Sequence, residues 1–269
     1  MHEIERHRVI LGEAAERPVV TVGQLVELTG ASEATIRRDI GALHVMGRLR
    51  RVRGGAEALH PPQTLGIAGR PFSVNEGVNV DKKRAIARAA VELCEDGESI
   101  IINGGTTTFQ MVHDLARRRM QILTNSFPIA EYLLRNSKNT ITLPGGAIYR
   151  EQNIVLSPFE NDVTQNFFAR RMFMSAQGVS SIGVMESDPL LIQAEQKLIN
   201  QAEELVLLLD AAKFASRSSL ILCRLERVHT IITDDGVSTR DAKFVEQSGI
   251  RLIVAERIAG VEEASSSAA

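Results

Sequence analysis

Apolar residues near the start of the chain recur every three or four positions, the spacing of one face of an α-helix. The pattern predicts helices over about residues 3–16, 22–28 and 32–43. Thr21 and Gln24 have the spacing of a capping box, and Ser32 is a good N-cap for the third helix. Residues 29–31 (Thr-Gly-Ala) supply a turn, so the chain opens as helix, helix, turn and helix.

The third predicted helix has two unlike faces. Ile36, Ile40 and Leu43 fall on one side, which can therefore anchor in a core. The other side combines small residues with two arginines, and its members are Ala34, Arg37, Arg38, Gly41 and Val45. Small residues let the helix backbone approach a groove of DNA, while the arginines reach phosphates or guanine edges.

A basic segment follows this helix. Over residues 35–53 six arginines oppose only Asp39, an excess of five positive charges, whereas the whole chain carries a net charge of −2. Such a patch attracts the DNA backbone, although the arginines alone are also compatible with a solvated helix and hairpin. Together with the capped helix pair, they predict a winged helix-turn-helix that contacts DNA through Ser32, Ala34, Thr35, Arg37, Arg38, Arg48, Arg50, Arg51 and Arg53.

The periodic pattern lapses between Ala56 and Asp81, where prolines and glycines interrupt any long element. Beyond it, short aliphatic runs alternate with helical stretches, which is typical of a largely parallel sheet covered by helices. Strands are expected at 99–102, 121–124, 140–143, 172–175, 205–209, 229–233 and 251–254, and helices around 82–93, 108–117, 128–135, 190–201 and 239–247. We therefore expect a DNA-binding domain over 1–57, a linker over 58–80, a Rossmann-like α/β domain over 81–258 and a disordered tail over 259–269.

Composition narrows the class of protein. Of the 269 residues 44% are hydrophobic, which is enough for one or two folded domains. Only Cys94 and Cys223 are present, without CxxC or Cys/His spacing, so no disulfide framework, metal or cofactor is expected. The chain starts without an apolar signal segment and has no run approaching about 18 apolar residues. These features predict a cytoplasmic protein without a membrane partner.

Three successive predicted strands end in similar loops, at 103–108 (Asn-Gly-Gly-Thr-Thr-Thr), 125–126 (Asn-Ser) and 144–150 (Pro-Gly-Gly-Ala-Ile-Tyr-Arg). The carboxyl ends of parallel strands share one edge of the sheet, where ligands collect. Gly104 and Gly105 let backbone N–H groups approach a ligand, the threonines add hydroxyls, and the next helix presents its positive end. A single Gly-Gly pair is more often a plain turn, but three loops in register predict an anion cradle suited to a phosphate.

An acid and a lysine, Asp210 and Lys213, follow another predicted strand. Lys213 would neutralise an anion bound at the shared edge. The alternative is an ordinary surface ion pair between the two side chains.

The chain resembles the DeoR family of bacterial transcriptional regulators from Arg6 to about Val254. The most specific match is Ser32-x-x-Thr35-Ile-Arg-Arg-Asp39-Ile-x-x-Leu43 with Gly47-x-Leu49 and Arg53-Gly-Gly-Ala56, which is similar to that family's DNA-binding signature. Looser matches are Gly105-Thr-Thr107, Thr124-Asn125, Gly145-Gly146 with Arg150, and Asp210-x-x-Lys213-Phe214. The resemblance implies a winged helix-turn-helix followed by an α/β sensor domain similar to ribose-phosphate isomerases, glucosamine-phosphate deaminases and CoA transferases.

The resemblance further implies a repressor of a carbohydrate catabolic operon whose binding to a double-stranded operator is modulated by a small phosphorylated sugar or polyol. A homodimer or homotetramer would match palindromic half-sites. The effector contacts implied by the loops and the family are Asn103, Gly104, Gly105, Thr106, Thr107, Thr108, Asn125, Ser126, Gly145, Gly146, Arg150, Gln177, Lys197 and Lys213. Many members carry Asp where this chain has Asn103, so the contact there differs. Gln177-Gly178 and Ala194-Glu-Gln-Lys197 look more like the branch that contains the ascorbate-operon repressor.

Because relatives of such a sensor fold are enzymes, the alternative is a sugar-phosphate isomerase or deaminase that carries a DNA-binding module. That chemistry needs a positioned acid and base. The loop over 175–188 has no histidine and places its acids late, at Glu186 and Asp188, while His113 and His229 read as structural. No catalytic residue is therefore expected. A third class, an architectural DNA binder without an effector, is distinguished by its lack of any response to phosphorylated sugars.

Overall fold

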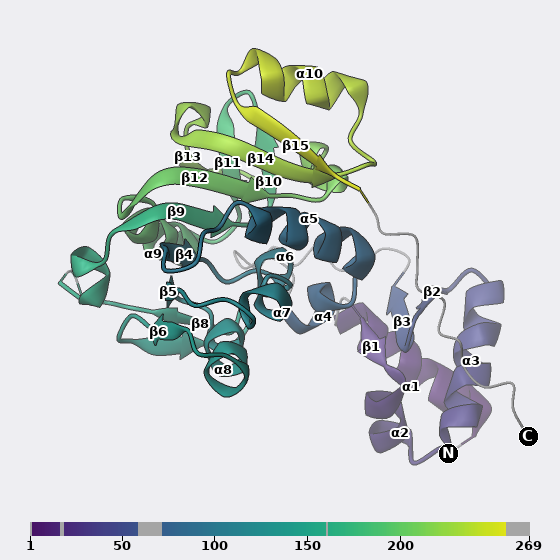
Figure 1. Ribbon diagram of the computed structural model, residues 1–269. Helices are drawn as coiled ribbons and strands as arrows, with labels where there is room; N and C mark the ends of the chain where they lie inside the picture. Colours follow the sequence, from purple (N-terminus) through teal and green to yellow (C-terminus); the bar gives the residue numbers. More distant parts are fainter. Residues whose placement is uncertain (1, 17–18, 59–71, 160, 257–269) are drawn as a thin grey trace, which may run out of the picture. The chain divides into compact units, whose positions relative to one another are not determined.

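The computed structural model describes residues 2–16, 19–58, 72–159 and 161–256. The chain divides into two compact units, Met1–Arg70 and Pro71–Ala269 (Figure 1). Each unit has its own hydrophobic core. Within the described ranges, no helix has the length and apolar character needed to cross a membrane.

Three helices and a small antiparallel sheet form the N-terminal unit. The helices are α1 (Glu3–Glu16), α2 (Val22–Thr29) and α3 (Glu33–Val45), and the strands are β1 (Val20–Thr21), β2 (Leu49–Val52) and β3 (Gly55–Ala58). β3 lies between β1 and β2 and pairs antiparallel with both. Ile10, Leu25, Ile36 and Leu43 are fully buried in the shared core. The predicted winged helix-turn-helix is therefore confirmed.

The ends of α2 and α3 follow from local signals in the sequence. The Thr21 side chain accepts from the Gln24 N–H, and the Thr21 N–H donates to the Gln24 side chain at 3.0 Å, which is the predicted capping box. Gly30 ends α2 with a φ of 66°, a left-handed conformation that glycine adopts without strain. The Ser32 hydroxyl then caps α3 by accepting from the Thr35 N–H at 3.2 Å.

A seven-stranded parallel sheet forms the middle of the second unit, in the order β15-β14-β12-β9-β4-β5-β6. Its strands are β4 (Ser99–Ile102), β5 (Gln121–Thr124), β6 (Thr140–Thr142), β9 (Ala169–Met174), β12 (Ala202–Leu208), β14 (Val228–Asp234) and β15 (Arg251–Ala255). They correspond to the seven aliphatic runs of the sequence, so the predicted α/β architecture is confirmed. The strand order reverses between β4 and β9, and crevices that bind ligands form beyond the carboxyl ends of strands at such a point.

Helices cover both faces of this sheet (Figure 1). α5 (Val80–Glu92), α6 (Thr106–Phe109), α7 (Val112–Leu115) and α8 (Phe127–Asn136) pack on one face, and α9 (Pro189–Ile199) and α10 (Thr239–Gln247) pack on the other. The prediction of a single helix over 108–117 was wrong, because Gln110 and Met111 separate α6 from α7. Three consecutive threonines open this segment, and the Thr108 hydroxyl donates to the backbone carbonyls of Asn103 and Gly105, which disfavours a longer helix.

Several short elements had no clear signal in the sequence. They are α4 (Phe72–Glu76), the hairpin of β7 (Ala147–Tyr149) and β8 (Ile154–Leu156), and a small antiparallel sheet of β10 (Gly178–Ser180), β11 (Gly183–Glu186) and β13 (Leu220–Cys223). The expected linker, 58–80, includes residues 59–71, which lie outside the described ranges, and its later part holds α4 and the start of α5. The expected tail, 259–269, also lies outside them.

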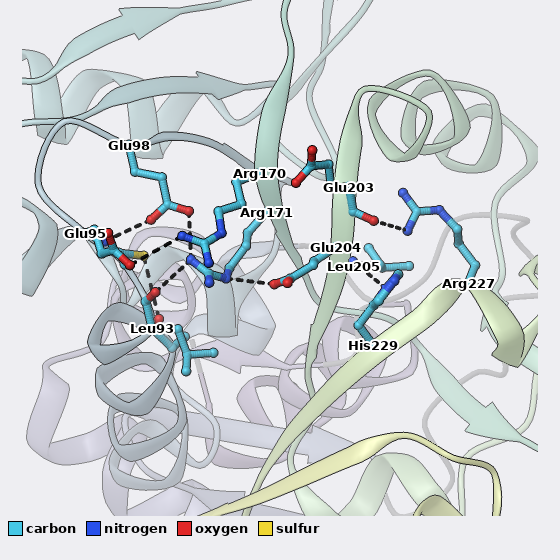
Figure 2. Close-up of polar contacts among 12 residues, drawn as sticks. Leu93, Glu95, Glu98, Arg170, Arg171, Glu203, Glu204, Leu205, Arg227 and His229 are labelled. Atoms are coloured by element: carbon cyan, nitrogen blue, oxygen red, sulfur yellow. Dashed lines mark hydrogen bonds and ion pairs between the residues drawn. The ribbon is translucent and has the colours of Figure 1, made fainter.

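A polar network lies toward the amino edge of the large sheet (Figure 2). Arg171 is at its centre and donates to Glu98 at 2.7 Å, to Glu204 at 2.9 Å and to the Leu93 carbonyl at 2.8 Å. The side chains of Arg171 and Glu98 are only 10% and 8% exposed. These contacts hold β4, β9 and β12 together near their starts.

Candidate functional site

In the N-terminal unit, α3 turns its apolar side inward and its basic side outward. Ile36 and Ile40 are buried, whereas Arg37 and Arg38 are exposed. Arg37 forms an exposed ion pair with Glu33, one helical turn away, at 3.1 Å, and such pairs contribute little to stability. The Arg38 side chain has no partner among the residues that the structure describes. Both guanidinium groups are therefore accessible to a ligand.

A hollow of about 510 Å³ lies between α3 and the wing formed by β2 and β3. Arg37 of the helix and Arg51 and Arg53 of the wing line it. The His44 ring ties the two walls together, since its Nδ1 lies 3.5 Å from the Arg51 backbone nitrogen and 3.3 Å from the Leu49 carbonyl oxygen. Helix and wing thus direct cations to one hollow, as a phosphate backbone requires.

The other predicted DNA contacts are placed differently. Arg50 pairs with Glu57 on the facing strand β3, and Arg48 lines a separate hollow beside α1. Ser32 and Thr35 form the N-terminal cap of α3, where their hydroxyl oxygens lie 2.9 Å apart, and Ala34 is exposed beside them.

Asp39, the acid within the basic segment, is buried. Its carboxylate accepts from Arg6 Nε at 2.7 Å and Arg6 Nη2 at 3.3 Å, and His7 Nε2 lies 3.4 Å away. The residue therefore joins α1 to α3 instead of offsetting the exposed arginines. Its position three residues after Ile36, on the inward side of the helix, was the signal for this role.

In the second unit, polar loops meet beyond the carboxyl ends of β4 and β9, where the strand order reverses. The Gly104 N–H donates to Asn125 Oδ1 at 2.8 Å, which joins the loops after β4 and β5. The Ser175 N–H donates to Asn103 Oδ1 at 3.1 Å, which joins the loops after β4 and β9. The Val155 N–H of the β7–β8 hairpin donates to the Asn125 carbonyl at 2.7 Å. The predicted convergence of the loops is confirmed.

Internal contacts shape the loop after β4. Asn103 is fully buried, and its Nδ2 donates to Glu195 at 2.7 Å and to the Ser175 carbonyl at 3.3 Å. Thr107 and Thr108 are buried as well. These side chains hold the loop in shape, and the partly exposed members that remain available to a ligand are Gly104, Gly105 and Thr106.

Asn125 carries a buried donor without an acceptor. Its side chain is 2% exposed, and its Nδ2 finds no hydrogen-bond partner within the described ranges. Buried donors are normally paired, so an unpaired one indicates a missing ligand or water. Ser126, next in the chain, is buried and uses its hydroxyl to cap α8 at the Ile129 N–H, 3.4 Å away.

Two lysines bring positive charge to the same edge of the sheet. Lys213 lies in the 3₁₀ turn η2 (Ala211–Phe214), just after β12. Lys83, which sequence reasoning missed, is 4% exposed and donates to the Asn75 carbonyl at 2.5 Å. Burial lowers the pKa of Lys83 to about 8, the charge of Lys213 lowers it as well, and Asp210 acts in the opposite direction. Two interacting ammonium groups beside one carboxylate favour a bound anion.

The remaining predicted effector contacts are spread along this edge. Gly145, Gly146 and Arg150 are exposed in and beside the β7–β8 hairpin, and Gln177 is half-buried beside β10. Lys197 donates to the carbonyls of Ser157 at 3.2 Å and Phe159 at 2.6 Å, so in this structure it holds the loop after β8.

Three buried carboxyl groups complete the edge: Glu186 at the end of β11, Asp188 at the N-cap of α9, and Glu195 within α9. Burial raises the pKa of Glu195 well above its usual range, and the charge of Glu186 raises it further. Burial likewise raises the pKa of Glu186. The Tyr149 hydroxyl donates to Asp188 at 2.9 Å. Acceptors of this kind suit the hydroxyl groups of a sugar or polyol.

From the sequence, Glu186 and Asp188 were not expected to be catalytic because they come late in their loop, and Glu195 was not singled out. The β10–β11 hairpin folds back, however, and returns Glu186 and Asp188 to the edge of the sheet. The signal for Glu195 was its place in the buried stripe of α9, between Leu191 and Leu198. A glutamate at such a position calls for a specific partner.

Replacing Glu195 with glutamine should remove a pH-dependent loss of stability. A carboxyl group whose pKa is raised in the folded state holds its proton there, so the free energy of unfolding falls as the pH rises above about 4.5. Glutamine keeps an acceptor for Asn103 without a charge. We therefore expect E195Q to have a higher melting temperature than wild type at neutral pH, and the two to converge near pH 4. The exposed Glu246→Gln is the control, and a lower melting temperature for E195Q at pH 7 would contradict the account.

Comparisons with known proteins match each of the two units to a family model. Residues 6–61 match the family model described as "DeoR-like helix-turn-helix domain", and residues 78–235 match "DeoR C terminal sensor domain". The proteins named "HTH-type transcriptional regulator UlaR" from Shigella dysenteriae serotype 1 (strain Sd197) and Escherichia coli (strain K12 / DH10B) are each 32% identical over 253 residues, covering 94% of this chain and 99% of the relative. These relatives are named as regulators and not as enzymes, so the isomerase or deaminase alternative finds no support.

Among solved structures, a ribose 5-phosphate isomerase A from Methanocaldococcus jannaschii aligns with a TM-score of 0.39 and 17% identity. The alignment covers 51% of this chain and 55% of that chain. A likeness at this level does not bear on function.

Proposed function

Because the chain belongs to the DeoR family of DNA-binding transcriptional regulators, we propose that it represses a carbohydrate catabolic operon and leaves its operator when a phosphorylated sugar or polyol binds the sensor domain. The observation that carries the second half of this proposal is the buried, unpaired Nδ2 of Asn125 beside the Gly104 loop. A buried donor without an acceptor, at the edge of a parallel sheet where ligands collect, supports a ligand contact at this position.

In the DNA-bound state, Arg37 and Arg38 enter the major groove while the wing arginines hold phosphates. The hollow that Arg37 shares with Arg51 and Arg53 supports this assignment. Arg48 and Arg50 join them as phosphate contacts, although Arg50 must first leave Glu57. A dimer or tetramer would present two such heads to the half-sites of a palindrome.

The effector's anionic group would lie where the lysines and the glycine loop meet. Lys213 and Lys83 supply positive charge, Gly104 and Gly105 admit the backbone, and Thr106 adds a hydroxyl. The carboxyl groups of Glu186, Asp188 and Glu195 would accept hydrogen bonds from the hydroxyl groups of the sugar. This division into a cationic end and an acidic end supports a phosphorylated polyol over a bare anion.

α4 offers the route by which the effector acts on the rest of the chain. It is the first described element after the boundary at Pro71, and it contacts three parts of the effector edge. The Phe72 N–H donates to the Glu151 carbonyl at 3.0 Å, the Phe72 ring packs edge-on against Phe109 with centroids 5.8 Å apart, and Lys83 donates to Asn75. A ligand that prefers one position of α4 shifts the regulator between two states, because it binds them unequally.

Replacing Lys213 with alanine should blunt the response to the effector without weakening the free protein's affinity for DNA. A hydrogen bond to a charged group contributes about 1.5–3 kcal/mol, so the sugar phosphate concentration for half-maximal operator release should rise about 10- to 150-fold. The measurement is fluorescence anisotropy of an operator duplex, selected from a random library by the full-length protein, titrated with a panel of sugar phosphates.

The exposed Lys243→Ala, which removes the same charge from α10, is the control and should respond as wild type does. If Lys213→Ala bound the operator poorly in the absence of effector, Lys213 would support the fold and not the signal.

A further inference from the structure

A second basic surface lies on the opposite edge of the sensor domain from the effector loops. It is a groove of about 440 Å³ formed by the segments that precede β5 and β6. Its lining residues are Ala116, Arg117, Arg118, Arg119, Arg135, Asn136, Ser137 and Lys138. Five of these eight residues are cations and none is an acid, in a chain whose net charge is −2. Neither the helix-turn-helix nor the effector edge accounts for this concentration of charge.

The cations of this amino-edge groove are poorly neutralised by the protein itself. The half-buried Arg118 pairs with the exposed Asp96 at 3.5 Å, and Arg135 and Glu131, both exposed, pair at 2.9 Å. Arg117, Arg119 and Lys138 are exposed, and their side chains form no hydrogen bond or ion pair with any described residue. Cations near the ends of α7 and α8 offset the helix dipoles, but that effect needs one charge per helix and reaches only the last turn. Five cations in one groove repel one another, and a bound anion would offset that repulsion.

The walls of the groove are held in place by Asn139. Its Nδ2 donates to the Leu115 carbonyl at 2.9 Å, and its Oδ1 accepts from the Met120 N–H at 2.8 Å. These bonds join the segment before β5 to the segment before β6, which carry the cations. The arginines and the lysine therefore project from a fixed frame.

We propose that the amino-edge groove binds the phosphate backbone of double-stranded DNA beyond the half-site that the helix-turn-helix reads. Arginine suits phosphates because its planar fork donates two parallel hydrogen bonds. The lining has no aromatic side chain, which single-stranded nucleic acids need for base stacking. Ala116 is its only apolar member, so it lacks the anchors that protein partners use. An open, charged groove without buried polar groups fits a polymer backbone better than a small metabolite.

The test compares a short operator duplex with the same duplex extended by flanking DNA that contains no second operator. Full-length wild-type protein should bind the extended duplex more tightly, and its affinity should fall more steeply with salt. The variant R117A/R119A/K138A should lose this difference while keeping its affinity for the short duplex. Three phosphate contacts correspond to a slope change of about 2.7, so between 50 and 200 mM salt wild type should lose about 40-fold more affinity for the extended duplex than the variant does.

The control variant R84A/R88A/R240A removes the same charge from exposed positions on α5 and α10 and should behave as wild type. The proposal is overturned if extension adds no affinity, if the control loses as much as the groove variant, or if the groove variant weakens binding to both duplexes equally. Binding of polyglutamate at the groove without any effect of extension would also overturn it, in favour of an acidic protein partner. The effector is absent throughout, so the result is independent of the proposed ligand.

Discussion

Replacing Arg38 with alanine should weaken operator binding about 5- to 150-fold, which corresponds to the loss of about 1–3 kcal/mol for an arginine that reads a base. Arg38 is exposed on the outward face of α3, and no described residue occupies its guanidinium group. The measurement is fluorescence anisotropy with the selected operator and with a scrambled duplex. Discrimination between the two should fall along with affinity, because a base contact is lost.

The matched control is Arg88→Ala, an exposed arginine of α5 whose loss changes the net charge equally. If both variants weakened operator and scrambled DNA to the same small extent, Arg38 would act through its charge alone. Another residue of α3 would then have to make the base contacts for α3 to remain the recognition helix.

Replacing Arg171 with alanine should lower the free energy of unfolding by about 3–5 kcal/mol, the usual cost of breaking a buried ion pair by removing one partner. The substitution leaves the Glu98 carboxylate, 8% exposed, without its guanidinium partner at the centre of the network in Figure 2. For a domain of this size the melting temperature should fall roughly 6–20 °C. Differential scanning calorimetry of the full-length protein measures it, with the transition of the sensor domain followed separately.

The adjacent Arg170 provides the control, since its pair with Glu95 is exposed and contributes about 0–1 kcal/mol. Equal shifts for Arg170→Ala and Arg171→Ala would show that burial at the amino edge does not determine the stability of the sheet.

Most of the fold followed from patterns that repeat along the chain. The seven aliphatic runs are the seven strands of the large sheet, and the caps at Thr21 and Ser32 placed α2 and α3. Local signals of this kind are strong because a strand covered by helices on both faces must be apolar along most of its length, and because helix ends must be satisfied wherever helices occur. The hairpin β7–β8 and the small sheet were not predicted, and strands outside the large sheet depend on tertiary pairing more than on their own sequence.

The candidate effector site was also predicted in part from the sequence. The strand-end loops were predictable, since parallel strands bring their carboxyl ends to one edge, and Gly104 and Asn125 do meet there. The site residues that the sequence did not predict are those whose role depends on burial. Lys83 and Glu195 lie in ordinary helical stretches, where the sequence suggests solvated charges, yet both are almost fully buried in the structure. Asn103 was expected to face a ligand, but its side-chain amide is hydrogen-bonded to Glu195 and to the backbone of Ser175.

We propose that one phosphorylated sugar or polyol and the operator bind to opposing states of this regulator. The most direct measurement is the affinity of the full-length protein for its operator as a function of the concentration of each compound in a sugar phosphate panel. We expect at least one compound to weaken operator binding by about 5- to 150-fold, and the operator to weaken binding of that compound by the same factor, since coupling is reciprocal. A compound that binds and stabilises the sensor domain while leaving operator affinity unchanged, with no other compound acting, would contradict it.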